Sequence, residues 1–236
     1  MSTRYSPQIV NTGLTMYLDA ANKNSYKGSG TNWSDLTGNN YDATMYGSVP
    51  FSNDGGGSFD FATVTGAVSY AASLGFTFAS NMVPTTGNFT FSTWIKNPPT
   101  NVGQSGFFSN AGGADGYRFG IGKDAVYFLI APTYTEAGVS FLSTLNSTSW
   151  YNVTAVFARG ESTPQIRTYL NGVFQSSVNF PVSQTAFTAY APGIVRSQCC
   201  MPLFTGKLSQ FSVYSKTLTT TEILQNFNAV RNRFGV

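Results

Sequence analysis

Apolar and polar residues alternate with a period of two in several separate stretches of this chain. In residues 14–18, Leu and Met alternate with Thr and Tyr, and similar alternation recurs in residues 89–95, 117–121 and 151–157. Many of these residues are β-branched or aromatic, the types that fit a pleated surface with one buried face. The pattern predicts an all-β fold.

Turn signals separate the predicted strands. Asn171-Gly172 lies between QIRTYL and VFQSSV, and this dipeptide predicts a two-residue hairpin because a type I′ turn needs positive φ at both positions. The segments NDGGG from Asn53 and NAGGADG from Asn110 are predicted to be longer loops. No linker, repeat or change of composition divides the chain, so residues 1–236 are expected to form one domain, with residues 1–11 as an extended N-terminal arm.

A single helix is predicted over residues 219–231. Thr219 is suited to the N-cap, and Glu222 is placed to bond back to the cap amide in a capping box. Ile223, Phe227 and Val230 follow at spacings of four and three, which gives one apolar stripe that can lie on a sheet.

Charge and hydropathy exclude several partners. The 13 Lys and Arg residues exceed the 10 acids by only three, and they form no basic run, so nucleic acid is not an expected partner. No apolar stretch approaches the roughly 20 residues of a membrane helix, so no membrane partner is expected. Cys199 and Cys200 are adjacent and cannot link distant segments; a vicinal disulfide and two reduced loop residues both remain open.

Seven stretches together resemble the laminin G-like branch of the concanavalin A-like lectin/glucanase superfamily. In chain order they are LTMYLDAAN from Leu14, WSDLTGNNYDAT from Trp33, SFDF from Ser58, FTFSTWIK from Phe89, WYNVTAVF from Trp150, YLNG from Tyr169, and GKLSQFSVYSKTLTTTEI from Gly206. The resemblance implies a jelly-roll sandwich of two antiparallel sheets with a short C-terminal helix. The fold hosts lectins, hydrolases, adhesion domains and phage particle proteins, so it leaves the function open.

The inventory of catalytic residues argues against an enzyme. The chain has no His, which removes the commonest general base and the serine triad. The glucanases of the superfamily that this chain resembles use a Glu-x-Asp-x-x-Glu strand motif. In this sequence Glu136, Glu161 and Glu222 lie far apart, and none is followed two residues later by Asp. We therefore expect no catalysis and, with the exception below, no cofactor.

Calcium is the one metal that the sequence suggests. Asp35, Asn39, Asn40 and Asp42 bracket Gly38 in a turn-rich stretch, and carboxylate and amide oxygens are the ligands that Ca²⁺ prefers. The alternative, which we favour, is a polar turn in which Asp35 and Asn39 bond their own backbone.

Glycan binding needs exposed aromatic rings beside polar groups. Loop tyrosines are the predicted candidates, namely Tyr26, Tyr134 and Tyr190. Trp94 and Trp150 lie within strand motifs and are expected to be buried, and Trp33 is expected to pack beneath its loop.

Two functions are consistent with these observations. The stretches GLTMYLDAANKNSY and EILQNFNAVRNRFGV resemble laminin G-like proteins of tailed phages, and no export signal is recognised. The first expectation is therefore a non-enzymatic virion protein, made in the host cytoplasm, which decorates a capsid or tail and contacts other virion proteins, copies of itself or a surface glycan. The alternative is a free, extracellular carbohydrate-binding module.

Overall fold

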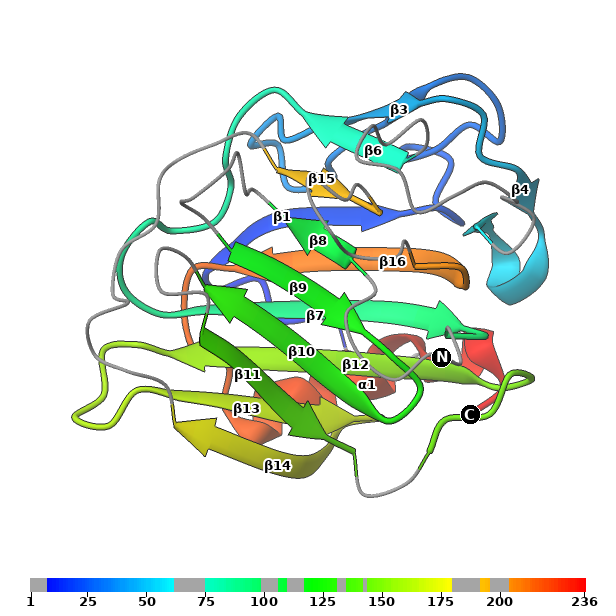
Figure 1. Cartoon of the computed structure of the whole chain (residues 1–236). Coiled ribbons are helices and arrows are strands. Elements are labelled where there is room, and N and C mark those ends of the chain that lie inside the picture. Colours follow the sequence, from blue (N-terminus) through cyan, green and yellow to red (C-terminus); the bar gives the residue numbers. More distant parts are fainter. Residues whose placement is uncertain are drawn as a thin grey trace, which may run out of the picture.

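Two antiparallel sheets pack face to face in the computed structural model, which describes residues 8–61, 75–98, 106–109, 117–130, 135–141, 144–179, 192–195 and 204–236. Figure 1 shows the two layers one behind the other, with the helix α1 on the far side of the rear layer. The architecture confirms the predicted all-β sandwich with a C-terminal helix, and it is consistent with a jelly roll.

The rear sheet, here called sheet A, has the strand order β14-β13-β12-β7-β16-β5-β4, and β1 also pairs with β16. Its strands are β1 (Leu14–Asp19), β4 (Phe51–Ser52), β5 (Ser58–Asp60), β7 (Phe89–Lys96), β12 (Trp150–Ala158), β13 (Gln165–Leu170), β14 (Val173–Asn179) and β16 (Lys207–Tyr214). β7 pairs with β12 and β16, and β16 also pairs with β1 and β5, so the centre of the sheet joins segments that are far apart in the chain.

The front sheet, here called sheet B, has the order β11-β10-β9-β8-β15-β6-β3-β2. Its strands are β2 (Asn32–Trp33), β3 (Ala43–Tyr46), β6 (Gly75–Phe78), β8 (Gly106–Ser109), β9 (Tyr117–Ile121), β10 (Ala125–Ile130), β11 (Thr135–Ser140) and β15 (Gly193–Ile194).

Aromatic rings fill the space between the sheets. Phe91 of β7 lies 5.1 Å from Phe108 and 5.6 Å from Phe119, measured between ring centroids, and Phe108 lies 4.8 Å from Phe211 of β16. Each such pair adds roughly 0.5–1.5 kcal/mol to the free energy gained by burying the rings. A core of phenylalanines from both layers therefore holds the sandwich together.

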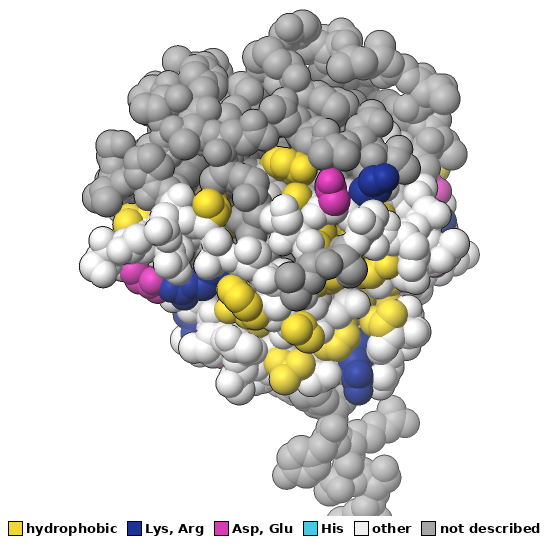
Figure 2. All heavy atoms as spheres, turned by 60° about the horizontal axis from the view of Figure 1, so that its bottom comes forward, with side chains coloured by type: hydrophobic (Ala, Val, Ile, Leu, Met, Phe, Trp, Pro, Cys, Tyr) yellow, Lys and Arg dark blue, Asp and Glu magenta, His cyan; other side chains and the backbone are white. Residues whose placement is uncertain are grey.

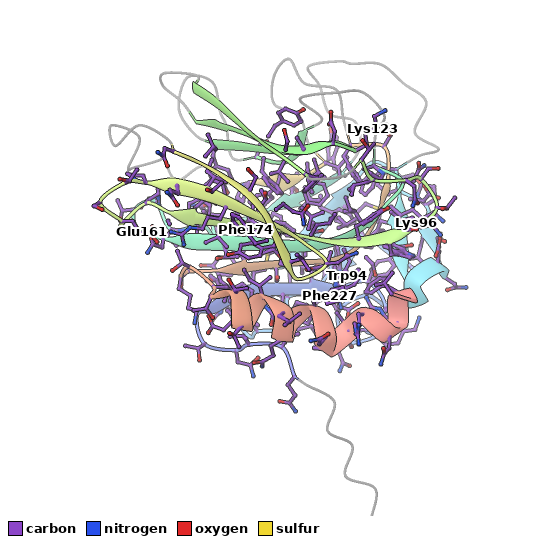
Figure 3. The ribbon with its side chains drawn as sticks, turned by 90° about the horizontal axis from the view of Figure 1, so that it is seen from below. Trp94, Lys96, Lys123, Glu161, Phe174 and Phe227 are labelled. Atoms are coloured by element: carbon purple, nitrogen blue, oxygen red, sulfur yellow. The ribbon has the colours of Figure 1, made fainter. Side chains whose placement is uncertain are left out.

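The helix α1 (Thr220–Phe234) covers the outer face of sheet A. Thr219 and Glu222 form the predicted capping box. The helix continues three residues beyond the predicted end at 231, because Phe234 extends the apolar stripe by another turn and Gly235 then ends the helix at φ 71°. The ring of Trp94 stacks on both Phe227 and Phe234, with centroids 5.7 and 4.0 Å away. Figure 3 shows Trp94 of sheet A close to Phe227 of α1.

This covering buries strands that the alternation predicted to be half-exposed. Seven of the eight residues of β7 are buried, including Trp94 on the face toward α1. Residues 8–10 of the expected N-terminal arm lie along α1, where the Val10 amide donates to Asn226 Oδ1 and Gln225 Nε2 donates to the Gln8 carbonyl. The helix thus forms a third layer over the sandwich.

The hairpin at Asn171-Gly172 is confirmed, with φ of 50° and 80°. It leads into β14, the edge strand of sheet A, where Val173 and Phe174 are 60% and 46% exposed. Leu224 of α1 is also exposed beside this turn. Figure 2 shows hydrophobic side chains gathered on this face. Within the described ranges, no helix is long and apolar enough to cross a bilayer.

Candidate functional site

A cleft of about 400 Å³ opens at one end of the sandwich. It lies where the short helix η1 (Asp54–Gly56), the end of β7, the start of β12 and the end of α1 meet. Its lining includes Asp54, Lys96, Thr148, Ser149, Trp150 and Phe234. We call it the terminal cleft; in Figure 3, Lys96 marks its position beside the last turn of α1.

The Asp54 carboxylate is held in the terminal cleft by three hydrogen bonds. Its Oδ1 accepts a hydrogen bond from Trp150 Nε1 (3.0 Å), and its Oδ2 accepts from Lys96 Nζ (3.0 Å) and Lys207 Nζ (3.1 Å). Partial burial acts to raise the pKa of Asp54, but the hydrogen bonds from Lys96, Trp150 and Lys207 outweigh it and lower this pKa to about 2. The cleft therefore contains a fixed, ionised carboxylate whose side chain is 29% exposed.

Gly55 brings the η1 backbone onto the Trp150 indole. Its φ is +65°, and a Cβ at this position would lie 2.8 Å from Trp150 Cζ2 and 3.0 Å from Phe234 Cε1. Only glycine permits both this conformation and this close contact. Trp150 is 4% exposed and forms the floor of the cleft.

Charges around the terminal cleft balance. Three cations pair with three carboxylates within 4 Å: Lys96 with Asp54, Lys207 with Asp54 and Asp60, and Arg233 with Asp19. These pairs tie η1, β5 and β1 to β7, β16 and α1. No excess of either sign remains among these six side chains.

The loop before β12 presents hydroxyl groups to the cleft. Asn146 Oδ1 accepts hydrogen bonds from the Thr148 amide (2.9 Å), the Thr148 hydroxyl (3.0 Å) and the Ser149 amide (2.8 Å). This arrangement fixes the turn, so the side chains of Thr148 and Ser149 line the cleft from a rigid support.

Asp35, one of the predicted calcium ligands, accepts four hydrogen bonds from the protein itself. Its Oδ1 accepts from the amides of Tyr17 and Thr37, both at 3.0 Å, and its Oδ2 accepts from the Thr37 hydroxyl (2.7 Å) and the Tyr41 amide (3.2 Å). A carboxylate has about four acceptor positions. All of them are used, and the bond to Thr37 is the local turn interaction that we favoured.

The other three calcium candidates have separate roles. Asp42 Oδ1 accepts from the Asp35 amide (2.8 Å), and Asn39 Nδ2 donates across the turn to the Thr15 carbonyl (2.8 Å) rather than to its own backbone. Asn40 has φ of 62° and supports the turn. In the part of the chain that the structure describes, no three His, Cys, Asp or Glu side chains are grouped to hold a metal. Calcium binding stays an untested prediction.

Tyr26 does not meet the requirement for a glycan-stacking residue. It is 3% exposed, and its ring packs against Phe59 at 4.8 Å and Phe51 at 5.1 Å. The prediction of an exposed ring was wrong because the loop folds Tyr26 back into the main core. Tyr134 and Tyr190 lie outside the described residues.

All three tryptophans are buried, as expected. Trp33 lies within the main core, with its ring 4.8 Å from Phe59. Trp94 and Trp150 instead belong to a separate cluster under α1. This second location puts Trp150 beneath the terminal cleft, which alternation alone did not indicate.

The described glutamate side chains have structural partners. Glu161 pairs with Arg167, and Glu222 pairs with Lys216 as well as capping α1. The side chain of Glu136 lies outside the described part. Glu161 and Glu222 are at separate places in the fold, so they do not form the pair of carboxylates that a glycosidase needs.

Sequence reasoning missed Asp54 and Lys96. Asp54 lies in NDGGG, which predicted only a loop, and Lys96 ends a strand motif. The one available signal was an acid followed by three glycines, because such a backbone can approach a neighbouring ring closely. The partners of Asp54 come from β7, β12 and β16, which only the folded sheet brings together.

Comparisons with known proteins agree with the architecture. The Laminin_G_3 family, described as the concanavalin A-like lectin/glucanases superfamily, matches residues 70–224, more than half of the chain. A search of curated proteins finds no match.

Many solved structures share the fold. The binding domain of botulinum neurotoxin DC in complex with SialylT has a TM-score of 0.68 at 14% identity, covering 93% of this chain and 52% of that one. For the binding domain of Paraclostridial Mosquitocidal Protein 1, the TM-score is 0.67 at 16% identity, with 92% of this chain and 52% of that one covered. This chain thus spans about half the length of these two binding domains.

A third structure matches over nearly its whole length. Domain 4 of AbnA, a GH43 extracellular arabinanase from Geobacillus stearothermophilus, was solved in complex with arabinotriose. Its TM-score is 0.65 at 15% identity, and the match covers 90% of this chain and 97% of that domain. At these identities the likeness concerns the fold alone. Together with the family match, it places this chain in the concanavalin A-like lectin/glucanases superfamily.

Proposed function

We propose that this protein is a non-catalytic carbohydrate-binding module that takes its ligand in the terminal cleft. The observation that carries the proposal is the Asp54 carboxylate, which is fixed by Trp150 and Lys96 at the wall of an open cleft of about 400 Å³. Ligand sites have volumes of roughly 300–1,000 Å³ and a few fixed polar groups. Asp54, Lys96 and the hydroxyls of Thr148 and Ser149 supply groups suited to a polyhydroxylated molecule.

The structural relatives support a binding role. Among them is an arabinanase domain solved with arabinotriose, and two others are the binding domains of a botulinum neurotoxin and of Paraclostridial Mosquitocidal Protein 1. The family also includes glucanases by its description, but the acidic residues described above lack the paired arrangement of a glycosidase. We therefore propose binding without hydrolysis.

Titration calorimetry with a panel of neutral and charged oligosaccharides tests this function. We expect weak binding, which Asp54→Asn lowers about tenfold because a hydrogen bond to a charged group is lost. The control is Asp42→Asn, which changes an exposed carboxylate in the loop next to β3 and should leave binding unchanged. Sugar binding that Asp54→Asn does not affect would place the site elsewhere, and hydrolysis of any ligand would refute the non-catalytic role.

One observation favours a second candidate, a structural subunit that packs against neighbouring proteins, as in a virion. Val173 and Phe174 of the edge strand β14 are exposed large apolar side chains, and so is Leu224, which lies next to Gly172 in the adjoining turn. Figure 2 shows hydrophobic side chains gathered on one face of the molecule. The strand VFQSSVN has no charged residue or proline, the features by which edge strands commonly avoid pairing.

Light scattering over a range of concentrations tests this candidate. If the chain assembles with its own copies through this edge, Val173→Ser with Phe174→Ser should convert larger species into monomer, and glycan binding should be unchanged. A wild-type chain that is monomeric at all concentrations would argue against self-assembly through β14.

A further inference from the structure

We infer that the terminal cleft selects a neutral sugar, which uses two neighbouring hydroxyls to bridge the Asp54 carboxylate and the Lys96 ammonium. The inference rests on the proposed function and names the ligand class for that site. Three features of the cleft lead to it: the pairing of its charges, the hydrogen-bonding positions that are still open, and the spacing of the two polar atoms.

The pairing of charges disfavours an acidic ligand. Arg233 Nη1 donates to both carboxylate oxygens of Asp19 (2.9 and 2.8 Å), and its Nη2 donates to Ser209 Oγ (2.9 Å). Lys207 lies 3.1 Å from Asp54 and 3.6 Å from Asp60. Arg233 and Lys207 are therefore already paired with carboxylates of the protein. A sugar carboxylate in the cleft would be repelled by the ionised Asp54 carboxylate.

An amino sugar is disfavoured for the complementary reason. The Asp54 carboxylate already has two ammonium groups within 3.1 Å, from Lys96 and Lys207. The charge of Asp54 is already balanced by these two lysines, so the attraction of a third cation to the carboxylate would be weak. Both lysines would also repel that cation. A neutral ligand incurs neither cost.

Open hydrogen-bonding positions remain for such a ligand. Among the residues that the structure describes, three bonds to Asp54 leave one of about four acceptor positions open, on Oδ1. Lys96 Nζ carries three donors, and its one bond within the described residues goes to Asp54. A sugar hydroxyl can therefore donate to Asp54 while another accepts from Lys96.

The spacing of these groups fits two hydroxyls on adjacent ring carbons. Lys96 Nζ lies 3.0 Å from Asp54 Oδ2, and the open acceptor position is on Oδ1 of the same carboxylate. The ligand atoms that contact Lys96 Nζ and Asp54 Oδ1 must therefore also be close neighbours. A hydroxyl both donates and accepts, which lets the pair satisfy an anion and a cation together. Because Trp150 and Phe234 are only 4% and 6% exposed, stacking contributes little, and these hydrogen bonds set the specificity.

Matched oligosaccharides test the selection. Cellotriose, its glucuronic acid counterpart and the glucosamine trimer differ mainly in charge, and the indole N–H resonance of Trp150, assigned with Trp150→Phe, reports binding at the cleft. We expect cellotriose to bind at least tenfold more tightly than either charged trimer, while the Trp33 and Trp94 resonances move less. Equal or tighter binding of a charged trimer at Trp150 would overturn neutral selection and leave the glycan-binding function intact. If no sugar shifts Trp150, both proposals fail at this site.

Lys96→Met separates ligand recognition from a structural role. The variant loses the donor and one of two ammonium groups at Asp54, so we expect cellotriose affinity to fall about tenfold and glucosamine trimer affinity to rise. Lys123→Met is the matched control; Figure 3 shows Lys123 on the opposite side of the sandwich from α1. A purely structural Lys96 would lower binding of all trimers alike, and that result would overturn the bridging role.

Discussion

Asp35 and Asp54 differ in the number of hydrogen bonds that the protein makes to them. Asp35 accepts four, from Tyr17, Thr37 and Tyr41. From the residues that the structure describes, Asp54 accepts three, donated by Trp150, Lys96 and Lys207. The Asp35 carboxylate, with all its acceptor positions used, therefore stabilises the fold. The Asp54 carboxylate, with one acceptor position open, can also bind a ligand.

Asp35→Asn should lower the free energy of unfolding by about 2 kcal/mol, because the amide that replaces one oxygen faces donors and leaves partly buried groups unpaired. Asp42→Asn is the control and should cost less, since the bonds to Asp42 from described residues are one from the Asp35 amide and a longer one from Asn32 Nδ2. Urea unfolding measures both. In the same experiment EDTA should not change the unfolding midpoint; a lower midpoint would revive calcium binding.

Gly55→Ala should lower the free energy of unfolding by about 2–4 kcal/mol, from positive φ and from overlap with the Trp150 ring. The control is Gly38→Ala, which has φ of +83° and nothing within 4 Å of its added Cβ. It should show only the conformational part, about 1–2 kcal/mol. Equal losses in thermal or urea unfolding would mean that η1 moves away from Trp150 at little cost.

At the scale of elements, α1 converts the outer face of sheet A into a second buried layer. The sheet contributes Trp94 and Trp150 from adjacent strands, and the helix contributes Phe227 and Phe234 seven residues apart. Because those two rings lie on one side of the helix, both can stack on the Trp94 ring. The same last turn forms a wall of the terminal cleft, so the helix links stability to the site.

Thr219→Ala should lower the free energy of unfolding by about 1 kcal/mol. The Thr219 hydroxyl accepts a hydrogen bond from the Glu222 amide and donates one to the Glu222 carboxylate, and the variant loses both. Thr221→Ala is the matched control. It changes an exposed residue inside the first turn and should be neutral or slightly stabilising, since Ala favours helices. Circular dichroism during chemical unfolding compares them, and equal effects would contradict the capping role.

At the scale of the whole molecule, titrating groups limit the pH range of stability. Asp54 has a folded pKa of about 2, below the unfolded value of about 3.9. Burial raises the pKa of Tyr17, Tyr117 and Tyr214 above the usual tyrosine value near 10. These groups act at opposite ends of the pH scale.

The Asp54 contribution to the free energy of unfolding is present above pH 4 or so and is lost as pH falls through about 2. The tyrosines contribute fully below about pH 10 and progressively less above it, because the unfolded chain ionises first. Urea unfolding should therefore give a plateau between about pH 4 and 10. Asp54→Asn should flatten the acid side relative to wild type, and an unchanged acid slope would contradict the lowered pKa.

The sequence determined those features that depend on neighbours along the chain. Alternation located β1, β7, β9 and β12, Asn171-Gly172 located the hairpin turn, and Thr219 with Glu222 located the start of α1. Each rests on local geometry, namely the period of a strand, the φ that a turn requires, and the reach of a capping side chain.

Only the tertiary structure decided which side chains meet. It buried Tyr26, extended α1 to Phe234, and brought Lys96, Trp150 and Lys207 from three strands onto Asp54. Strand order and the packing of α1 on sheet A depend on contacts between distant segments, which no local pattern encodes. The terminal cleft and its balanced charges exist only because sheet A places the ends of β7, β12 and β16 beside η1.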